Sequence, residues 1–174
     1  MASAGNQEII PTGTFHKKGA CVVIIKTEWN QSIVDELENG CREVLESNNV
    51  THVITFTVPG AVEIPFAIRK CWESMKYRDL KPSAFVALGT VIRGDTPHFD
   101  YVCSMVSDGI SQLNLTLPVP VVFGVLTLEN EQQALERIGG KHGHKGREAG
   151  DAALKMILLA DEMETKAKAL NSIP

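Results

Sequence analysis

The sequence predicts an α/β protein built as a three-layer αβα sandwich around a four-stranded parallel sheet. Short, continuously apolar segments alternate with longer segments whose apolar residues recur at helical spacing. This alternation is typical of a parallel sheet that is covered by helices on both faces. The 174 residues are enough for one domain with a sizeable core. We therefore expect a tail over residues 1–18 and a single domain over residues 19–174, with right-handed crossovers.

The first half of this domain is expected to hold two strands and two helices. The strand ACVVIIK covers residues 20–26, and an amphipathic helix follows over residues 31–47. The second strand, HVITFTV, covers residues 52–58 and ends at a proline-glycine turn. The next helix is expected over residues 63–77, because its apolar residues recur every three or four positions.

The second half continues the alternation. The strand SAFVALG covers residues 83–89, and a helix is expected over residues 97–115. Thr96 is a suitable N-cap for that helix, and Pro97 suits its first position. The remaining elements are a strand over residues 119–128, a short helix over 131–138, the turn-rich segment GGKHGHKG, and a helix over 147–170.

Composition excludes several classes of function. The formal net charge is −4 and no basic run occurs, so nothing indicates nucleic-acid binding. No apolar stretch reaches the roughly 18 residues that suggest a membrane span, and the first residues do not resemble a secretory signal. The four cysteines are scattered at apolar positions without a CxxC pair. We expect buried free thiols and a cytoplasmic protein.

The most informative stretch is GTVIRGDTPHFDYV, residues 89–102. It runs from the end of an apolar strand into the start of a helix, where parallel α/β sheets bind ligands. Free N–H groups at a helix start favour an anion, and Gly94 with Thr96 suits such a seat. His98 follows, and a histidine can move protons near neutral pH. The stretch is therefore interpreted as a phosphate seat with an acid–base group beside it.

Other candidate residues fall at the ends of the remaining strands, and each also has an ordinary structural explanation. Trp29 follows the first strand and could stack on a planar heterocycle or pack in the core. Gly60 allows backbone N–H groups to approach a ligand or simply makes a tight turn. Glu63 could bind a hydroxyl or favour the helix start. Arg137 and Lys145 could be ligand cations or solvated charges.

Two other kinds of site find little support. A nucleophile elbow of the GxSxG type is absent from the sequence. His142 and His144 lie one residue apart in a glycine-rich segment, but no cysteine or carboxylate stands at metal-ligand spacing from them. We therefore expect no metal site.

These motifs together resemble the lumazine synthase (6,7-dimethyl-8-ribityllumazine synthase) family, whose fold is flavodoxin-like. The resemblance covers nearly the whole chain and keeps the order and spacing of the family's motifs. They are Trp29-Asn30, VPGAVEIPF at 58–66, GTVIRGDTPHFDYV at 89–102, VPVVFGVLTLEN at 119–130 and QALERIGGKHGHKG at 133–146. The family condenses 5-amino-6-ribitylamino-uracil with 3,4-dihydroxy-2-butanone 4-phosphate and needs neither cofactor nor metal. Membership would make this chain a transferase of riboflavin biosynthesis.

The resemblance also implies roles for individual residues. Trp29, Asn30, Val91 and Ile92 would contact the pyrimidine, and His98 would be the acid–base group. Gly60, Ala61, Val62 and Glu63 would surround the ribityl chain. Gly94, Asp95 and Thr96 would cradle the phosphate, Arg137 would pair with it, and Lys145 would add positive charge. Phe123 would come from a neighbouring subunit.

Three positions depart from the family pattern or need a particular geometry. The family usually has phenylalanine where this chain has Trp29, and often an aromatic residue where it has Val62. The larger indole of Trp29 should still stack. Asp95 stands where an anion is expected, so its backbone N–H should face the phosphate and its carboxylate should point away.

The resemblance implies self-association as cyclic pentamers, and the short GGKHGHKG turn favours a shell of sixty subunits. The tail holds Ile9, Ile10 and Phe15, which suit a strand added to a neighbour's sheet. Riboflavin synthase is a further expected partner. Two alternatives are a non-catalytic flavin carrier of flavodoxin type and a shell subunit that has lost catalysis. A response-regulator receiver is disfavoured because its set of acidic residues and lysine is missing.

Overall fold

Four parallel strands form the central sheet in the computed structural model, which describes residues 15–170. The strands are β1 (Cys21–Thr27), β2 (His52–Val58), β3 (Ala84–Ile92) and β4 (Val121–Leu128), in the order β2-β1-β3-β4. β1 pairs with both β2 and β3, and β4 pairs with β3, all in parallel. The predicted fold class is therefore confirmed.

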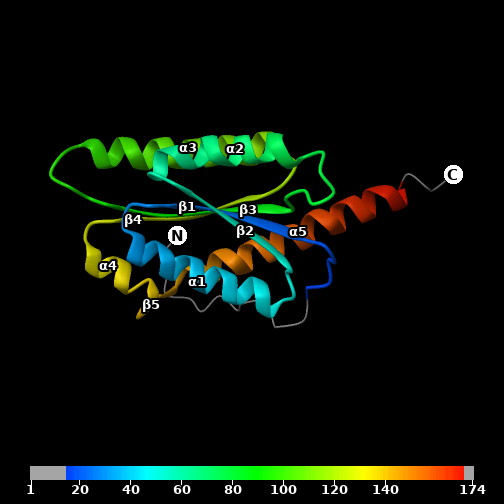
Figure 1. The fold of residues 1–174 in the computed structure, drawn as a ribbon, viewed down its shortest axis with the longest axis horizontal. Coiled ribbons are helices and arrows are strands. Elements are labelled where there is room, and N and C mark those ends of the chain that lie inside the picture. Colours follow the sequence, from blue (N-terminus) through cyan, green and yellow to red (C-terminus); the bar gives the residue numbers. More distant parts are fainter. Residues whose placement is uncertain (1–14, 171–174) are drawn as a thin grey trace.

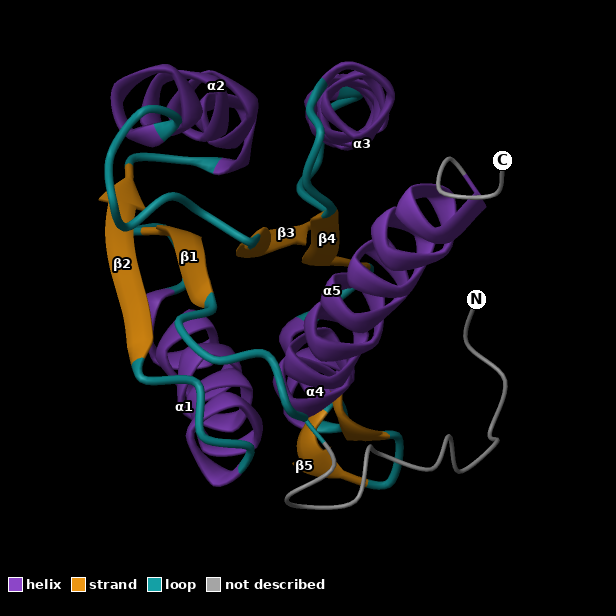
Figure 2. Cartoon of the chain, turned by 90° about the vertical axis from the view of Figure 1, so that its right-hand side faces the viewer, coloured by secondary structure: helices purple, strands orange, loops and turns teal. Residues whose placement is uncertain are grey.

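Helices cover both faces of this sheet (Figures 1 and 2). On one face lie α2 (Ile64–Met75), preceded by a short 3₁₀ helix η1 (Ala61–Glu63), and α3 (His98–Thr116). On the other face lie α1 (Gln31–Ser47), the short α4 (Glu131–Leu135) and α5 (Lys145–Leu170). Each face has its own hydrophobic core, so the sheet is buried between two apolar layers.

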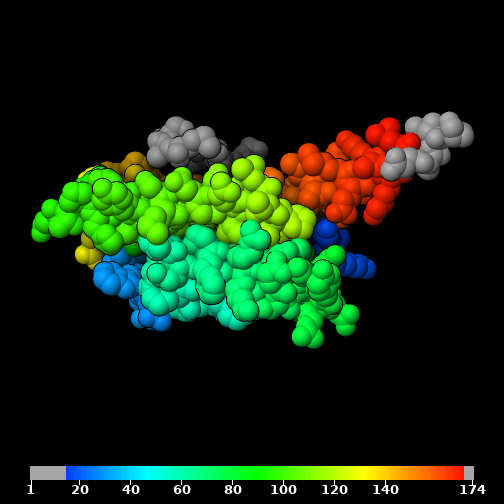
Figure 3. Space-filling view, turned by 90° about the horizontal axis from the view of Figure 1, so that it is seen from above, coloured from blue at the N-terminus to red at the C-terminus, as the bar shows by residue number. Residues whose placement is uncertain are grey.

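The two inner strands, β1 and β3, are largely buried because their residues are apolar on both sides, whereas the edge strand β2 has no buried residue. Every residue of β3 from Ala84 to Thr90 is buried, as expected for a strand between two helix layers. The apolar stripe of α1 faces the sheet as predicted, with Ile33, Leu37 and Cys41 among its buried residues. Seen from above, α2 and α3 lie side by side, and α5 extends past them (Figure 3).

The contact between α1 and α5 is unusually close because glycines lie in it. A Cβ atom at Gly146 would stand 2.0 Å from the carbonyl oxygen of Leu37, and one at Gly150 would stand 2.9 Å from that of Cys41. Gly40 of α1 similarly leaves room for the imidazole of His144. The two helix backbones can approach to this distance only where side chains are missing.

Several element boundaries differ from those predicted. The position before α3 is occupied by Pro97, so the helix begins at His98 and Thr96 is not its N-cap. The turn-rich segment forms a small antiparallel hairpin of β5 (Ile138–Gly140) and β6 (Gly143–His144). Gly139 and Gly143 have positive φ angles, which the glycine-rich sequence allows. Four glycines in so short a segment hide its strand character from the sequence.

The structure corrects one assignment in the tail. Phe15 is buried in the core of its own chain, so it is not available to a neighbour's sheet. Ile9 and Ile10 lie outside the described residues. The cysteines are free, and Cys103 is only partly buried, whereas Cys21, Cys41 and Cys71 are buried. Over residues 15–170, none of the helices is long and apolar enough to cross a membrane.

A charged network joins α1 to β1 and β2. Glu38 accepts hydrogen bonds from Lys26 Nζ at 2.7 Å, Arg42 Nε at 2.8 Å and Thr55 Oγ1 at 2.6 Å. Burial by itself would raise the pKa of Glu38. The three hydrogen bonds outweigh burial and lower this pKa from its ordinary value of 4.5 to about 2.

Replacing this carboxylate should make the fold less stable in a pH-dependent way. Because the folded-state pKa of Glu38 is lowered, its contribution is present above its unfolded pKa and is lost as the pH falls through about 2. Glu38→Gln should therefore lower the free energy of unfolding by roughly 2 kcal/mol at pH 7. The difference from wild type should shrink between pH 4.5 and pH 2. Urea titrations at several pH values measure it, and a difference that is the same at every pH would contradict the assignment.

Candidate active site

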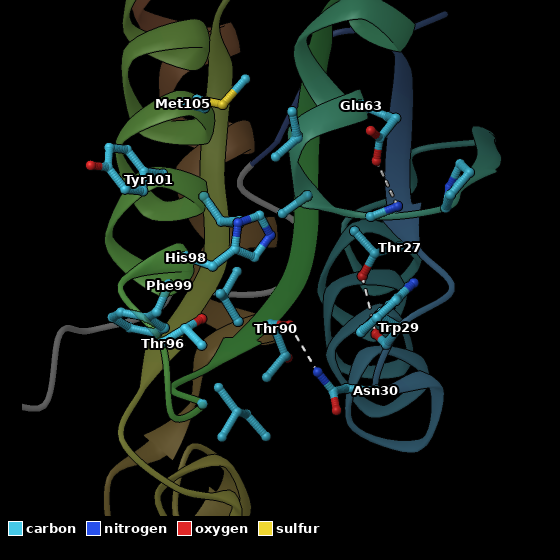
Figure 4. A pocket seen from close by; sticks show the side chains of 18 residues that line it. Thr27, Trp29, Asn30, Glu63, Thr90, Thr96, His98, Phe99, Tyr101 and Met105 are labelled. Carbon is cyan, nitrogen blue, oxygen red and sulfur yellow. Dashed lines mark hydrogen bonds between the residues drawn. The ribbon is translucent and has the colours of Figure 1, made fainter.

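A pocket opens at the carboxyl ends of the strands, where the chain leaves the sheet in different directions. After β1 the chain crosses to β2 at one edge, and after β3 it crosses to β4 at the other edge. Such a switch point leaves a crevice between neighbouring strands, and ligands of open α/β sheets bind there. The pocket has a volume of about 580 Å³, which suits a small organic ligand. Figure 4 shows the side chains that line it.

One wall comes from the end of β1. Trp29 is 73% exposed and lines the pocket, so it is not a core residue. Asn30 has a left-handed backbone with φ 58°, and its Nδ2 donates a 3.0 Å hydrogen bond to the carbonyl oxygen of Thr90. Thr27 Oγ1 donates to the Trp29 carbonyl oxygen at 3.3 Å. These contacts hold the indole-bearing turn against β3.

A second wall follows β2. The backbone N–H of Gly60 donates to Glu63 Oε2 at 2.9 Å, and the backbone N–H of Glu63 donates to the Gly60 carbonyl oxygen at 3.3 Å, so the two residues close the start of the 3₁₀ helix. Gly60, Ala61, Val62 and Glu63 all line the pocket. The carboxylate of Glu63 thus has a structural partner and also faces the cavity.

The third wall is formed by the end of β3 and the start of α3. Gly94 and Thr96 line the pocket in the turn between these elements, and both are exposed. His98 is the first residue of α3, and its imidazole points into the pocket (Figure 4). The first N–H groups of this 19-residue helix lack partners within the helix, which favours an anion beside them.

The structure brings most of the predicted residues together in this one pocket. Those that line it are Trp29, Asn30, Gly60, Ala61, Val62, Glu63, Val91, Ile92, Gly94, Thr96 and His98. An aromatic ring, backbone polar groups, a carboxylate and a histidine therefore surround a single cavity. Such a set can stack a heterocycle, hold an anion and transfer a proton.

Comparison with known proteins identifies the family. Residues 19–161 match the family model of 6,7-dimethyl-8-ribityllumazine synthase. The chain is 45% identical over 147 residues to the protein of that name from Bdellovibrio bacteriovorus, covering 84% of this chain and 79% of the relative. It is 44% identical over 151 residues to the Porphyromonas gingivalis protein of that name, covering 86% and 88%. The Desulfovibrio desulfuricans protein of that name is 42% identical over 153 residues, covering 87% and 95%.

The chain belongs to the lumazine synthase family. Both the family match and these relatives span most of the described fold. The family resemblance predicted from the sequence motifs is thereby confirmed. Each of the three walls of the pocket lies within the matched residues.

Four predicted site residues do not line the pocket of this lumazine synthase chain. Asp95 is exposed in the turn before α3, and Phe123 lies on the edge strand β4 with 43% of its surface exposed. Arg137 Nη1 donates to the Gln133 carbonyl oxygen at 2.9 Å, and Lys145 Nζ pairs with Glu148 at 2.7 Å. Arg137 and Lys145 are also joined by a 2.8 Å backbone hydrogen bond, so the structure brings these two cations together elsewhere.

Sequence reasoning missed several residues that line the pocket. Met105 lies seven residues after His98 on the same side of α3, whereas the Tyr101 ring points to the other side of the helix (Figure 4), although both residues line the pocket. Helical spacing from His98 is a usable signal for such residues, and Val102, four residues after His98, also lines the pocket. Thr27 and Thr90 were hidden because threonine is common in strands.

Among residues 15–170, no group of three or more histidine, cysteine, aspartate or glutamate side chains is placed to hold a metal ion. His144 packs against Gly40, and desolvation by this burial lowers its pKa below the ordinary value of 6.5.

Proposed function

We propose that this chain condenses 5-amino-6-ribitylamino-uracil with 3,4-dihydroxy-2-butanone 4-phosphate to give 6,7-dimethyl-8-ribityllumazine, with release of phosphate and water. One observation carries the proposal. Most of the predicted site residues of a chain that matches the lumazine synthase family converge on one pocket at the switch point of the sheet. The relatives are named 6,7-dimethyl-8-ribityllumazine synthase, which is the enzyme of this reaction.

The three walls suggest a place for each part of the substrates. The pyrimidine stacks on Trp29 and contacts Val91 and Ile92. The ribityl chain lies along residues 60–63, where Glu63 binds a hydroxyl. The phosphate of the four-carbon substrate lies at Gly94 and Thr96, beside the start of α3.

The proposed chemistry requires proton transfers at several steps. The pyrimidine amine attacks the ketone carbon, and loss of water leaves an imine. Removal of a proton then expels phosphate, and ring closure releases water again. His98 is the pocket residue that can both accept and donate these protons near neutral pH. Holding two substrates together supplies much of the remaining acceleration.

A turnover assay with the two substrates tests the proposal. Formation of the lumazine chromophore and release of phosphate should appear together, and each should require both substrates. The alternatives are a non-catalytic flavin-binding homologue and a shell-forming homologue. Either one would bind a flavin or assemble without consuming the substrates, and this result would reject the proposed function.

We further propose that neighbouring subunits complete the site. Phe123, Arg137 and Lys145 do not line their own chain's pocket, yet they are partly or largely exposed on the β4, α4 and hairpin side. A phosphate seat benefits from a charged partner. In this proposal a neighbour's β4 side supplies Phe123 and Arg137, and Lys145 adds positive charge.

Arg137→Ala should raise KM for the four-carbon phosphate far more than for the pyrimidine. The physical reason is the loss of a charge-assisted contact to the phosphate alone. Equal changes in both KM values would count against this role for Arg137.

Mixing two variants tests the shared site directly. His98→Ala and Arg137→Ala subunits should complement each other after joint refolding. With random equal mixing, about a quarter of the sites should hold an intact His98 and an intact neighbouring Arg137, because each condition is met half the time. If the mixed assemblies were no more active than the separate variants, His98 and Arg137 would act in the site of the same chain.

The assembly is proposed to be a pentamer, and further association to a sixty-subunit shell is proposed because the hairpin of residues 138–144 is short. Association with riboflavin synthase and a cytoplasmic location are part of the same proposal. Analytical ultracentrifugation at neutral pH separates the assemblies. A single species of pentamer mass would reject the shell, and an active monomer would reject the shared site.

A further inference from the structure

Arg93 immediately precedes Gly94 of the proposed phosphate seat and does not itself line the pocket. It follows β3, and its backbone N–H donates to the Leu128 carbonyl oxygen at 2.8 Å. Its guanidinium is held at three points. Nε donates to Glu129 Oε2 at 2.8 Å, Nη2 donates to Asp100 Oδ1 at 3.1 Å, and the group lies 4.1 Å from the centre of the Phe99 ring.

These contacts connect three parts of the fold. Arg93 directly follows β3, and Glu129 directly follows β4. Phe99 and Asp100 belong to the first turn of α3. Glu129 is fixed in turn, because its backbone N–H donates to Gln133 Oε1 at 3.0 Å. The arginine therefore bridges two turns at the carboxyl edge of the sheet.

The turn between β3 and α3 has little packing of its own. Every residue from Arg93 to His98 is exposed, and a Cβ atom at Gly94 would meet nothing within 4 Å. Burial therefore does not fix the positions of Gly94 and Thr96. Arg93, at the start of the turn, contacts Phe99 and Asp100 just beyond its other end.

We propose that Arg93 is a positioning residue, which holds residues 94–98 so that Gly94, Thr96 and His98 face the pocket together. The inference deepens the proposed function and uses its reaction as one readout. Arginine suits this task because its planar guanidinium can contact two carboxylates and an aromatic face at once, whereas a lysine ammonium is a point charge.

The test compares four variants with wild type, one of which combines Arg93→Met with the double variant described next. Arg93→Met removes the bridge, and the double variant Asp100→Asn with Glu129→Gln removes the carboxylates that hold it. Arg42→Met is the matched control, because Arg42 also bridges carboxylates but joins α1 to β2 away from the pocket. The measurements are kcat, both KM values, Tm, and the binding of inorganic phosphate by calorimetry.

Loss of positioning should affect the phosphate seat and His98 together. Arg93→Met should lower kcat/KM for the four-carbon phosphate by roughly 10- to 100-fold, since small displacements of reacting groups have effects of this size. It should change KM for the pyrimidine less than about twofold, because the Trp29 wall is untouched. The double variant should lower kcat as well, and adding Arg93→Met to it should have little further effect. Arg42→Met should lower Tm and leave the kinetic constants near those of wild type.

Each other outcome overturns the inference. Wild-type kinetics in Arg93→Met would show a purely structural ion pair. Tighter phosphate binding and unchanged kcat in the double variant would show that Arg93 contacts phosphate directly once released. If wild type made no lumazine, the proposed function would fail, and phosphate binding would still decide the inference. Equal phosphate affinities of wild type and Arg93→Met would then reject it.

Discussion

His98→Ala is expected to lower kcat by roughly 10²–10⁴, which is the usual contribution of a positioned acid–base group. The imidazole points into the pocket from the first residue of α3, beside Gly94 and Thr96. Substrate binding should persist, because Trp29 and residues 60–63 are unchanged. KM values should therefore move much less than kcat.

A matched control separates this role from a general effect of losing a histidine. His52 is exposed at the first residue of β2, at the opposite end of the strands from the pocket. His52→Ala should leave kcat within about twofold of wild type, as expected for a surface substitution. A wild-type kcat in His98→Ala would assign proton transfer to another group.

Gly146→Ala is expected to destabilise the fold by about 3 kcal/mol or more, which is the upper part of the range for overpacking. Alanine normally favours a helix over glycine by about 1 kcal/mol, so propensity alone predicts the opposite sign. The steric clash outweighs helix propensity and sets the sign of the stability change, because the added Cβ would stand 2.0 Å from a backbone oxygen of Leu37. Backbone cannot yield as a side chain can, so α1 and α5 must separate.

Chemical denaturation should show a graded series along α5. Gly150→Ala should lower the free energy of unfolding less than Gly146→Ala does, because its added Cβ would stand 2.9 Å from the backbone oxygen of Cys41. Glu164→Ala, on the exposed end of the same helix, should be within about 0.5 kcal/mol of wild type. Equal stabilities of all three variants would mean that the helices do not pack as described.

The sequence predicted the central fold because burial and periodicity are local signals. The continuous apolar run of β3 and the stripe of α1 both correspond to buried positions in the structure. The hairpin at residues 138–144 was missed because glycine has little strand propensity, so pairing depends on contacts made after folding. Phe15 was assigned to a neighbour, but an apolar residue also packs well in its own core.

The pocket was predictable to the extent that its residues follow strands. Trp29, Gly60 and Gly94 were found by their positions at strand ends. Tyr101 and Met105 were not predicted as pocket residues, since apolar residues on an amphipathic helix are usually core residues. The bridge of Arg93 to Glu129 spans 36 residues of sequence, and only the register of β3 with β4 brings these two side chains together.

The left-handed backbone of Asn30 restricts which sequences evolution can use at this position. Most residues lose about 1–2 kcal/mol in that conformation, whereas asparagine and glycine adopt it readily. Glycine would adopt this backbone conformation but would lack the side-chain amide that donates to the Thr90 carbonyl oxygen. Aspartate keeps the size of the side chain but has no N–H to donate. Lineages that diverge from this protein can therefore vary the exposed residue at position 29 more freely than its neighbour Asn30.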